Sequence, residues 1–368
     1  MVEWKKLGEV CTLERGVRVV RKNLQESGPI PVFQNSLTPL GFFEKSNYPA
    51  NIPFVICAGA AGEIGFSNGP FWAADDCTCI LCKSSTISKF AYYYLLVKQH
   101  SLKSQVRKAS VPRLSKNTIE NLIIPIPSIA EQKRIVGILD TFTASIDNLK
   151  EQISQRRKQF ECYRDQLLDL EGKEGVEMKT LEDCAILISD GDHQPPPKTQ
   201  QGIPFITISN INKDNHKIDF SNTYYVPKEY YESIKNERKA KEGDVLYTVT
   251  GSYGIPVNID FAKEFCFQRH IAMIRPNIDV LFSKFLYHSL LTMGVKKQAD
   301  ENASGGAQKT VSLSSLRKFI IYVPPTSEQQ RIVSILETFE ESISNLEAQL
   351  EQRQKQYEYY RNQLLTFD

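Results

Sequence analysis

The sequence lacks the segments that would place it in a membrane or carry it across one. It has no run of 18 apolar residues, so it predicts no transmembrane helix. Its first residues, MVEWKKLGEV, lack the apolar core of a signal peptide. We therefore expect a cytoplasmic protein, and its 368 residues are enough for two or three domains with a sizeable core.

Motifs of the common enzyme classes are missing as well. There is no phosphate-binding loop with Gly-Lys-Ser/Thr, no HExxH, no GxSxG, no GxGxxG and no EF-hand loop. Val323–Thr326 (VPPT) resembles an amino-methyltransferase motif only superficially, because the Asn or Asp before the prolines and the aromatic residue after them are absent. His193 and His270 have no paired nucleophile. The sequence therefore favours a binding protein over an enzyme.

The cysteines have no spacing typical of a metal site. Cys77, Cys79 and Cys82 are close in sequence, but no second pair of ligands follows at zinc-site spacing. They also lie in an alternating, strand-like run, CTCILC. We expect free thiols and no metal, and an enzyme built on this cluster is an alternative hypothesis.

What the sequence does have is an internal repeat. Residues 131–167 (EQKRIVGILDTFTASIDNLKEQISQRRKQFECYRDQL) return at residues 328–364 (EQQRIVSILETFEESISNLEAQLEQRQKQYEYYRNQL), with 23 of 37 positions identical. In each copy apolar residues recur at alternating steps of four and three, which predicts a long helix with a heptad seam. Arg156 and Arg353 occupy one seam position in both copies, where a polar residue can fix the register.

The globular parts repeat more weakly. Val2–Cys11 resembles Val176–Ala185, and Val55–Gly65 resembles Asp244–Gly254, each an apolar strand entering a glycine-containing turn. Further strands are expected at Thr78–Leu81 and His270–Ile274, helices at about Ser88–Lys98 and Ser283–Thr292, and serine-initiated turns with a final strand at Leu114–Ile126 and Val311–Val323. We expect globular domains at residues 1–125 and 172–322, and long helices at residues 126–171 and 323–368.

The order of these segments constrains how the helices pair. Each helix would be about 60 Å long, whereas a domain of this size is less than about 40 Å wide. The second domain begins where the first helix ends and ends where the second helix begins, so its attachment points fit an antiparallel pair. By the same argument Val2–Cys11 lies beside the end of the second helix. We predict an α+β protein with two globular domains at opposite ends of an antiparallel two-helix coiled coil, a pseudo-two-fold internal repeat. Separate packing of the helices onto the domains is the alternative.

Charge differs between the two domains. Residues 1–125 carry 15 Lys and Arg against 9 Asp and Glu, whereas residues 176–322 carry 18 against 17, in a chain of formal net charge +2. The first domain is basic enough to bind DNA phosphates. Charge alone would not identify the second domain as a nucleic-acid binder.

The junctions that precede the helices carry a family resemblance. Ile126–Val136 (IPSIAEQKRIV) and Val323–Val333 (VPPTSEQQRIV) share a strand end, a proline and a Glu-Gln-x-Arg-Ile-Val start. With two globular domains alternating with two near-identical helices, the chain resembles specificity subunits of type I restriction-modification systems over essentially its whole length. Residues 304–312 (SGGAQKTVS) resemble the family's loop before the final strand. In the first half Val111 stands where Gln308 stands, so we carry no glutamine contact over to the first domain.

The resemblance implies a non-catalytic subunit with one target recognition domain for each half of a bipartite, asymmetric DNA site. The two helices would set the half-site spacing and dock two methyltransferase (modification) subunits. Those partners would bring S-adenosylmethionine, and two restriction (helicase-nuclease) subunits using ATP and Mg²⁺ could join, so this chain would itself hold no cofactor. A coiled-coil scaffold without DNA specificity is the alternative function.

Base-reading side chains are expected among polar residues on loops. The candidates in the first domain are Arg15, Arg18, Arg21, Lys22, Gln34, Asn35, Arg107 and Arg113. The candidates in the second domain are Asp192, His193, Gln194, Asn210, Asn212, Ser252, Tyr253, Arg269, Gln308 and Lys309. Asn210 and Asn212 could instead form turns.

Polar residues that recur in both helices are candidates for docking a partner twice. They are Glu131, Gln132, Arg134, Arg164 and Gln166 in the first helix, and Glu328, Gln329, Arg331, Arg361 and Gln363 in the second. Helix capping and register are the alternative explanation for their recurrence.

Overall fold

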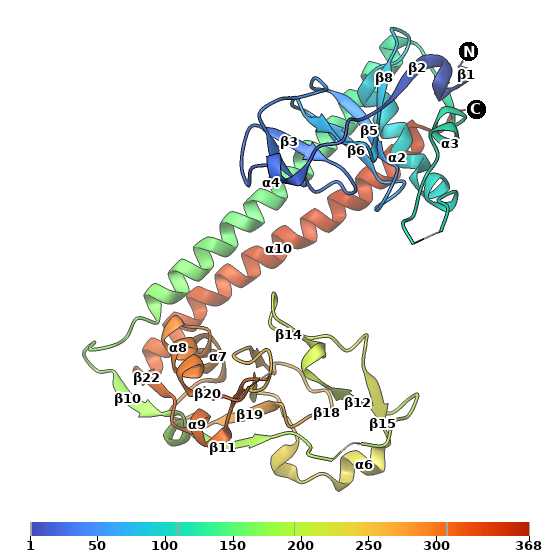
Figure 1. The fold of residues 1–368 in the computed structure, drawn as a ribbon. Helices are drawn as coiled ribbons and strands as arrows, with labels where there is room; N and C mark the ends of the chain where they lie inside the picture. The colour runs from blue at the N-terminus through green and yellow to red at the C-terminus, as the bar shows by residue number, and fades with distance from the viewer. Residues whose placement is uncertain (1, 109, 195, 307, 368) are drawn as a thin grey trace. The chain divides into compact units, whose positions relative to one another are not determined.

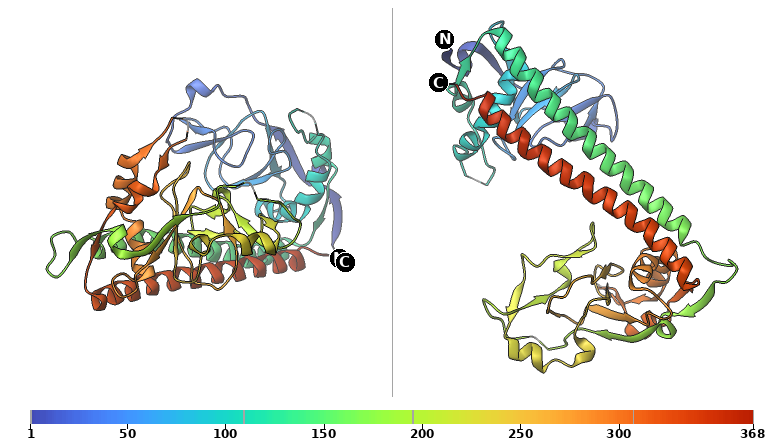
Figure 2. Two further views of the ribbon diagram at one scale, coloured as in Figure 1. Left: turned by 90° about the horizontal axis from the view of Figure 1, so that it is seen from below. Right: turned by 180° about the vertical axis from the view of Figure 1, so that it is seen from behind.

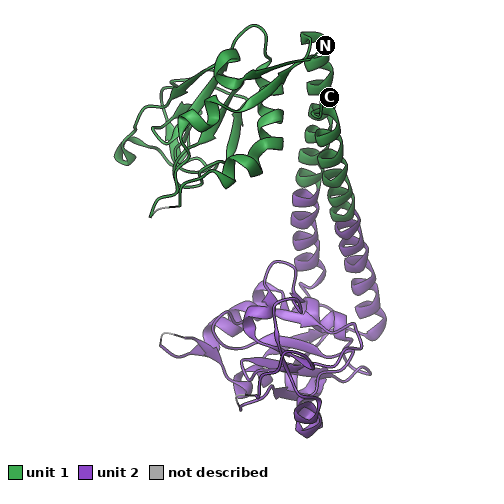
Figure 3. Ribbon diagram, turned by 90° about the vertical axis from the view of Figure 1, so that its right-hand side faces the viewer, with its two compact units in different colours: residues 1–152, 346–368 green, residues 153–345 purple. Residues whose placement is uncertain are grey.

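The structure is a computed structural model that describes residues 2–108, 110–194, 196–306 and 308–367. It divides into two compact units (Figure 3). Unit 1 comprises Met1–Gln152 and Leu346–Asp368, and unit 2 comprises Ile153–Asn345. The two long helices, α4 (Ile129–Leu167) and α10 (Thr326–Leu364), are labelled in Figure 1, and each contributes residues to both units (Figure 3). Each unit therefore holds one globular domain and a segment of each long helix.

In the described residues of unit 1, the globular domain contains three small sheets and three helices. The four-stranded sheet has the order β2 (Cys11–Arg15), β8 (Cys77–Cys82), β5 (Ile52–Ile56), β6 (Ile64–Ser67). The three-stranded sheet has the order β4 (Gly41–Phe43), β3 (Ile30–Phe33), β7 (Trp72–Ala73), and β1 (Glu3–Lys6) pairs with β9 (Ile123–Ile126). The helices are α1 (Leu7–Val10), α2 (Ser88–Ser104) and α3 (Lys116–Glu120), with a 3₁₀ turn, η1, at Arg21–Asn23.

The domain of unit 2 repeats this plan. Its four-stranded sheet has the order β11 (Ala185–Asp190), β19 (Ile271–Pro276), β16 (Val245–Thr248), β17 (Pro256–Asn258). Its three-stranded sheet has the order β15 (Tyr224–Val226), β12 (Ile203–Ile206), β18 (Cys266–Phe267), and β10 (Glu177–Thr180) pairs with β22 (Ile320–Val323). The equivalent helices are α5 (Leu181–Cys184), α7 (Ser283–Leu290) and α9 (Leu313–Arg317).

Unit 2 also carries elements without a counterpart among the described elements of unit 1. They are the hairpin β13 (Ile211–Asn212) with β14 (Lys217–Ile218), the helix α6 (Lys228–Ser233), and the 3₁₀ turns η2 (Ile208–Asn210) and η3 (Asn236–Arg238). Helix α8 (Met293–Asn302) follows α7 in the place where α2 continues unbroken, and the hairpin β20 (Ala303–Ser304) with β21 (Thr310–Val311) takes the place of the single bridge between Arg107 and Arg113. The predicted helix at about Ser283–Thr292 ends at Leu290, and α8 was not predicted. Thr292 caps α8, since its hydroxyl accepts from the backbone N–H of Val295.

The predicted α+β fold with its internal repeat is confirmed, and in each unit the helix segments run antiparallel. In unit 1 an early residue of α4, Phe142, stacks on a late residue of α10, Tyr360, with ring centroids 5.3 Å apart. In unit 2 the late α4 residue Tyr163 packs on the early α10 residue Phe339 at 5.2 Å. The apolar seam places these side chains on one face of each helix.

The two seam arginines pack on aromatic rings. In unit 1 the guanidinium of Arg353 lies 5.8 Å from the ring centre of Phe142, and in unit 2 that of Arg156 lies 5.9 Å from the ring centre of Phe339. A cation over a ring face is attracted by the ring quadrupole. This contact explains why arginine is compatible with a seam position in both copies.

The chain ends meet within unit 1. Leu7 and Leu365 belong to one buried cluster with Ile135 and Leu139 of α4. Strand β1 and the C-terminal end of α10 lie side by side in both views of Figure 2. This is the predicted position of the N-terminal segment. No helix among the described residues is long and apolar enough to span a membrane.

One predicted alignment is wrong. The sequence comparison paired Val55–Gly65 with Asp244–Gly254, which sets Gly65 against Gly254. In the structure Gly62 is the equivalent of Gly254, because each donates its N–H to the last residue of the preceding strand, Ile56 (2.8 Å) or Thr248 (2.9 Å). The true register is shifted by three residues, since glycines recur in both segments and short apolar runs align in several ways.

Candidate nucleic-acid interface

Strand β2 ends at a glycine that lies against a neighbouring backbone. The N–H of Gly16 donates to the carbonyl of Cys77 at 3.0 Å, and the N–H of Val17 donates to that of Ala73 at 2.9 Å. A Cβ at Gly16 would lie 2.3 Å from the Ala73 oxygen. The position therefore has no room for a side chain.

Strand β11 ends in the same way. The N–H of Gly191 donates to Ile271 at 3.3 Å, and that of Asp192 to Phe267 at 2.8 Å. A Cβ at Gly191 would lie 2.1 Å from the Phe267 oxygen. The two domains thus place the first residues after this strand by the same close backbone approach.

A glycine turn in the first domain joins two further segments. Gly59 has a positive φ of 83° and donates its N–H to Pro112 at 3.3 Å. Two residues earlier, Cys57 donates its N–H to Asp76 at 2.7 Å and accepts from Leu114 at 2.9 Å. The left-handed conformation at Gly59 favours glycine over other residues.

The second domain repeats this arrangement at Gly251, whose φ is 72°. Its N–H donates to Lys309 at 2.9 Å. Val249 donates its N–H to His270 at 2.9 Å and accepts from Val311 at 2.8 Å. Each bond has its counterpart in the first domain.

We call this shared set of backbone segments the loop frame. It consists of residues 16–17, 57–59, 73–77 and 112–114 in the first domain, and of residues 191–192, 249–251, 267–271 and 309–311 in the second. Because Pro112 and Lys309 are equivalent acceptors, Val111 corresponds to Gln308, as the sequence predicted. One backbone arrangement therefore presents different side chains in the two domains.

Several predicted DNA contacts of the second domain gather beside residues 191–192. The Asp192 carboxylate accepts from the Tyr230 hydroxyl and from the Gln194 N–H (3.1 Å), and the Asp192 carbonyl accepts from the Arg269 N–H (3.0 Å). His193 Nε2 lies 2.7 Å from a carboxylate oxygen of Asp190. Burial, and then the bond to Asp192, raise the pKa of Tyr230, which keeps this hydroxyl a donor.

The other predicted contacts of this domain gather at the glycine turn. Ser252, Gln308 and Lys309 are exposed. The hydroxyl of Tyr253 donates to Asp300 at 2.9 Å. The pairing of Thr250 with Thr310 brings the two segments together. Donors and acceptors on exposed loops suit base edges in a groove.

In the first domain the corresponding segment is cationic. Arg15 donates through Nε to the carbonyl of Asp75 at 2.5 Å. Arg18, Arg21 and Lys22 are exposed, and the last two lie in η1. Guanidinium and ammonium groups on an exposed segment can contact phosphates or guanine.

The remaining candidates of the first domain also flank its loop frame. The carbonyl of Asn35 accepts from the N–H of Ala60 at 2.9 Å, which holds the Gln34–Asn35 loop beside the glycine turn. Arg107 and Arg113 pair with each other, with the N–H of Arg107 donating at 2.8 Å. Residue 109, within this predicted loop, lies outside the described residues.

Two asparagines make turns, as their alternative interpretation held. Asn210 is buried, and its amide bonds the backbone of Thr207, Asp219 and Asn222. The side chain of Asn212 accepts from the N–H of Asp214 at 2.8 Å. The burial of Asn210 excludes it as a base reader, which corrects that part of the prediction.

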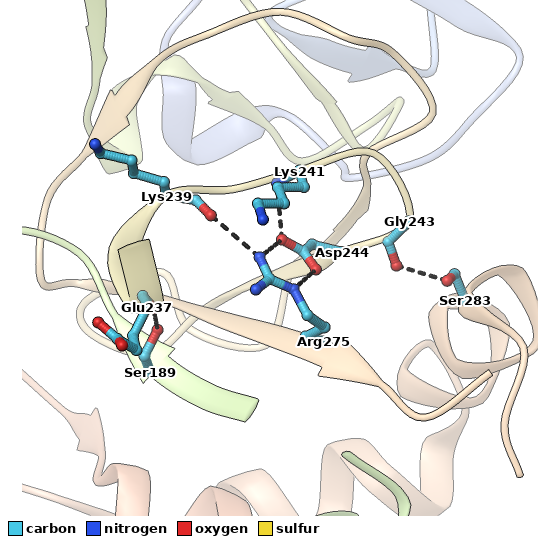
Figure 4. Close-up of polar contacts among 8 residues, drawn as sticks. All are labelled: Ser189, Glu237, Lys239, Lys241, Gly243, Asp244, Arg275 and Ser283. Carbon is cyan, nitrogen blue, oxygen red and sulfur yellow. Dashed lines mark hydrogen bonds and ion pairs between the residues drawn. The ribbon is translucent and has the colours of Figure 1, made fainter. Parts of the chain in front are cut away.

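An ion pair with a buried carboxylate and a half-buried guanidinium supports the loop frame of the second domain (Figure 4). Arg275 donates through Nε and Nη2 to both carboxylate oxygens of Asp244, at 2.8 and 2.7 Å. Arg275 also donates to the carbonyl of Lys239 at 3.2 Å, and Asp244 accepts from the N–H of Lys241 at 2.8 Å. The bond to Asp244 raises the pKa of Arg275. The pair joins the start of β16, which leads into the frame, to β19, which follows it.

The first domain has apolar residues at these two positions. The strand pairing sets Ile52 in the place of Asp244 and Leu81 in that of Arg275. Both belong to one apolar cluster. Sequence reasoning missed the ion pair because its partners are 31 residues apart and no local pattern links them.

No group of three His, Cys, Asp or Glu residues in the described part of the chain could hold a metal. The three thiols in the CTCILC run have different surroundings. Cys77 donates to the carbonyl of Phe33 at 3.3 Å, Cys79 is buried in an apolar cluster, and Cys82 meets Cys11.

The family model of the type I restriction modification DNA specificity domain matches residues 1–156 and residues 173–354. The chain belongs to this family. Each matched segment contains one complete loop frame. The duplication seen in the backbone is thus a duplication of the specificity domain.

Relatives of similar length carry the same designation. A putative type I restriction enzyme specificity subunit from Haemophilus influenzae is 29% identical over 391 residues, covering 100% of this chain and 96% of the relative. A type I restriction enzyme specificity subunit from Escherichia coli is 29% identical over 400 residues, with 100% and 94% covered.

Two solved structures share the fold. The S subunit of a type I restriction-modification system from M. genitalium has a TM-score of 0.66 at 16% identity, covering 100% of this chain and 97% of that one. A chain from a structure of a type I restriction-modification system has a TM-score of 0.60 at 18% identity, with 99% and 96% covered.

One pair of predicted docking residues in this specificity subunit is internal to its domains. Gln132 is fully buried, accepts from the N–H of Ile87 at 2.8 Å, and donates to the carbonyls of Ser85 (2.9 Å) and Pro127 (3.0 Å). These bonds fasten the start of α4 to the loop that leads into α2.

Gln329 does the same in the second domain. It accepts from the N–H of Phe282 at 3.0 Å and donates to Val280 (2.8 Å) and Pro324 (2.9 Å). Both glutamines are 0% exposed, so they cannot form part of a docking surface. The structure corrects this prediction, and positioning of the helix explains their recurrence.

The other recurring helix residues keep at least part of their side chains at the surface. Arg134 forms a two-bond pair with Glu131, and Arg331 with Glu328, each with a contact of 2.7 Å. These bonds lower the pKa of both carboxyls. Further along the helices, Arg164 pairs with Asp165, Arg361 lies over Tyr357, Gln166 bonds Cys162 and Gln363 bonds Tyr359.

Proposed function

We propose that each domain of this DNA-specificity subunit reads one half of a bipartite, asymmetric DNA site through the side chains on its loop frame. The observation that carries the proposal is one backbone arrangement that occurs twice with different polar groups. A basic set around Arg15 and Arg18 accompanies the first frame, and a mixed set around Asp192 and Gln308 accompanies the second. Different donors and acceptors on equivalent loops select different bases.

In this proposal the helices α4 and α10 set the half-site spacing and dock two methyltransferase subunits. The recurrence of the exposed Glu131–Arg134 pair as Glu328–Arg331 supports docking of the same partner twice. The partners supply S-adenosylmethionine and the methyl transfer to adenine. Restriction subunits that use ATP and Mg²⁺ join the same assembly, and this chain carries out no chemistry itself.

The test combines the purified chain with its modification partner on a library of random duplexes. Adenine methylation at one bipartite motif, only when both proteins are present, is the expected result. Methylation by the isolated chain with S-adenosylmethionine would contradict the non-catalytic role. Absence of sequence selectivity with the partner present would favour the scaffold alternative.

Helix length gives a second test. Equal insertions of two helical turns in α4 and α10 should change the spacing between half-sites and leave the bases unchanged. A change of bases at constant spacing would exclude the spacing role.

A further inference from the structure

Two thiols of the first domain face each other across an antiparallel strand pair. Cys11 begins β2 and Cys82 ends β8, and the register sets them directly opposite. Their sulfur atoms are 3.2 Å apart. Opposite residues of an antiparallel ladder have Cα atoms about 4.5–5.5 Å apart, and a disulfide requires about 4.4–6.8 Å. A bond between these sulfurs therefore needs no movement of the strands.

The two thiols differ in the way that peroxide chemistry requires. Cys11 is 1% exposed and donates its S–H to Cys82, which is half-buried. This hydrogen bond, with a weaker one from Ser88, lowers the pKa of Cys82, whereas the pKa of Cys11 is raised. The residue with the larger exposed surface is thus also the one whose thiol more readily becomes a thiolate, the form that attacks an oxidant.

We propose that Cys11 and Cys82 form an oxidation site at which a hydroperoxide converts the two thiols into a disulfide within the first domain. The inference is independent of the proposed function, because it rests on one strand pair.

The reaction proceeds in two balanced steps. The Cys82 thiolate attacks one peroxide oxygen, so an S–O bond forms and the O–O bond breaks. Cys82 becomes a sulfenic acid, and the departing hydroxide takes up a proton to become water. The Cys11 sulfur then attacks Cys82, the S–S bond forms, and the sulfenic oxygen leaves as water with the Cys11 proton. Overall, two thiols and one hydrogen peroxide give one disulfide and two waters, with the sulfurs losing the two electrons that the peroxide gains.

The other cysteines provide internal comparisons. Cys77 and Cys79 are fully buried, and burial raises the pKa of both, that of Cys79 to about 12. Cys162 is exposed and its sulfur meets an amide, that of Gln166. The second domain has Ala185 paired with Pro276 at the position equivalent to the dithiol. This disulfide could therefore form in the first domain and not at the equivalent position of the second.

A disulfide here would close a loop between residues 71 positions apart. It would join the first residue of β2 to the last residue of β8. The loop frame lies at the other end of this strand pair, where Gly16 follows β2 and donates to the first residue of β8. Cross-links that close long loops restrict the unfolded chain. We expect the first domain to unfold at a higher temperature once oxidised, while the second domain is unchanged.

The experiment treats the full chain with graded hydrogen peroxide, blocks remaining thiols with iodoacetamide and maps peptides by mass spectrometry without reduction. Trypsin leaves Cys11 in residues 7–15 and places Cys57, Cys77, Cys79 and Cys82 together in residues 46–83. The expected product is a linkage of these peptides, two hydrogens lighter than their sum, with fragmentation assigning the bond to Cys82. The linkage should form at a lower peroxide dose than the one that oxidises Cys77 and Cys79. The free thiols left at these two residues are measured by alkylation of the unfolded chain without reductant.

Two variants separate the steps. Cys11→Ser should leave Cys82 as a sulfenic acid that dimedone traps, and Cys82→Ser should leave Cys11 reduced. Cys162→Ser is the matched control and should form the linkage at the wild-type rate. The proposal is overturned if the wild-type chain gives no Cys11–Cys82 linkage, or forms it no faster than Cys162 is oxidised. If a variant fails to fold, the presence or absence of the Cys11–Cys82 linkage in the wild-type chain decides the proposal.

Discussion

The two recognition domains have the same loop frame but support it with different interior side chains. In the second domain the strands that lead into the frame are joined by the Asp244–Arg275 ion pair, and in the first domain Ile52 and Leu81 fill the same places. Charge in one domain and hydrocarbon in the other support equivalent backbone hydrogen bonds. The frame therefore depends on strand register and glycines, while the side chains that support the strands can differ between the domains.

The largest expected effect comes from breaking the ion pair. Asp244→Ala should cost about 3–5 kcal/mol of unfolding free energy in the second domain, because it leaves Arg275 without its partner. The double change Asp244→Ile and Arg275→Leu, which copies the first domain, should recover most of this loss. Urea denaturation monitored by circular dichroism measures the unfolding free energy of the single and the double variant.

Tryptophan emission gives the control for that measurement. Trp4 and Trp72 both lie in unit 1, so the unfolding transition seen in tryptophan emission reports on the first domain alone. Its urea midpoint should be the same in the variants as in the wild type. A double variant as unstable as Asp244→Ala would show that the two interiors are not interchangeable.

The next effect concerns the glycines that sequence reasoning missed. Gly16→Ala and Gly191→Ala should each cost about 1–3 kcal/mol, since the new methyl meets a backbone oxygen. Each should also lower discrimination at one half-site by about tenfold or more while sparing the other half. Methylation of mismatched half-sites with the modification partner is the readout.

Gly69→Ala is the matched control, because no atom lies within 4 Å of a Cβ at that position. It should behave as wild type in both assays. Equal losses at both half-sites from either frame variant would refute the assignment of one frame to one half-site.

A third prediction uses pH. Burial lowers the pKa of His288 to about 3, with the charges of Arg164 and Lys284 adding to the effect, whereas the equivalent residue of α2 is Tyr93, whose hydroxyl donates to Asp140 at 2.6 Å. The unfolded pKa is about 6.5. Folding therefore favours the neutral ring, and its stabilisation is complete above about pH 6.5 and is lost as the pH falls toward 3.

Between pH 7 and pH 5 the second domain should lose about 2 kcal/mol relative to the first. Urea denaturation at both pH values measures the loss. His216, whose pKa burial also lowers, acts in the same direction. His288→Tyr, the residue of the first domain, should remove most of the pH dependence, and an unchanged dependence in that variant would exclude His288 as its source.

The smallest effect distinguishes equivalent positions on the two frames. Gln308→Ala should weaken selection at one base pair by about 1 kcal/mol. Val111→Ala, at the matching position, should change it by less than about 0.5 kcal/mol. Competition between duplexes that differ at single positions measures both, and equal losses from the two variants would show that the amide does not read a base.

Sequence reasoning worked where a signal was local or repeated. The heptad seam predicted both long helices, and the serines Ser115 and Ser312 start α3 and α9 by accepting from Thr118 and Ser315 N–H groups. The order of segments predicted that the helices pair antiparallel, because a domain's width limits the separation of its ends.

It failed where a residue's role depends on distant neighbours. Repetition suggested that Gln132 and Gln329 contact a partner, but repetition is equally required of a residue that fastens a helix to its own domain. Gly16 and Gly191 are separated in sequence from the carbonyls they approach, so nothing local marks them. The alignment of Val55–Gly65 was wrong by three residues because it depended mainly on matching glycines, which recur within both segments.

The packing of the seam arginines is reciprocal. Arg353 of the second helix copy lies over Phe142 of the first, and Arg156 of the first copy lies over Phe339 of the second. Since 156 and 353 are equivalent positions, as are 142 and 339, the two contacts are the same contact with the copies exchanged, which is the rule of an isologous interface. The present chain thus keeps, inside one polypeptide, the self-complementarity by which two identical half-length chains would have recognised each other.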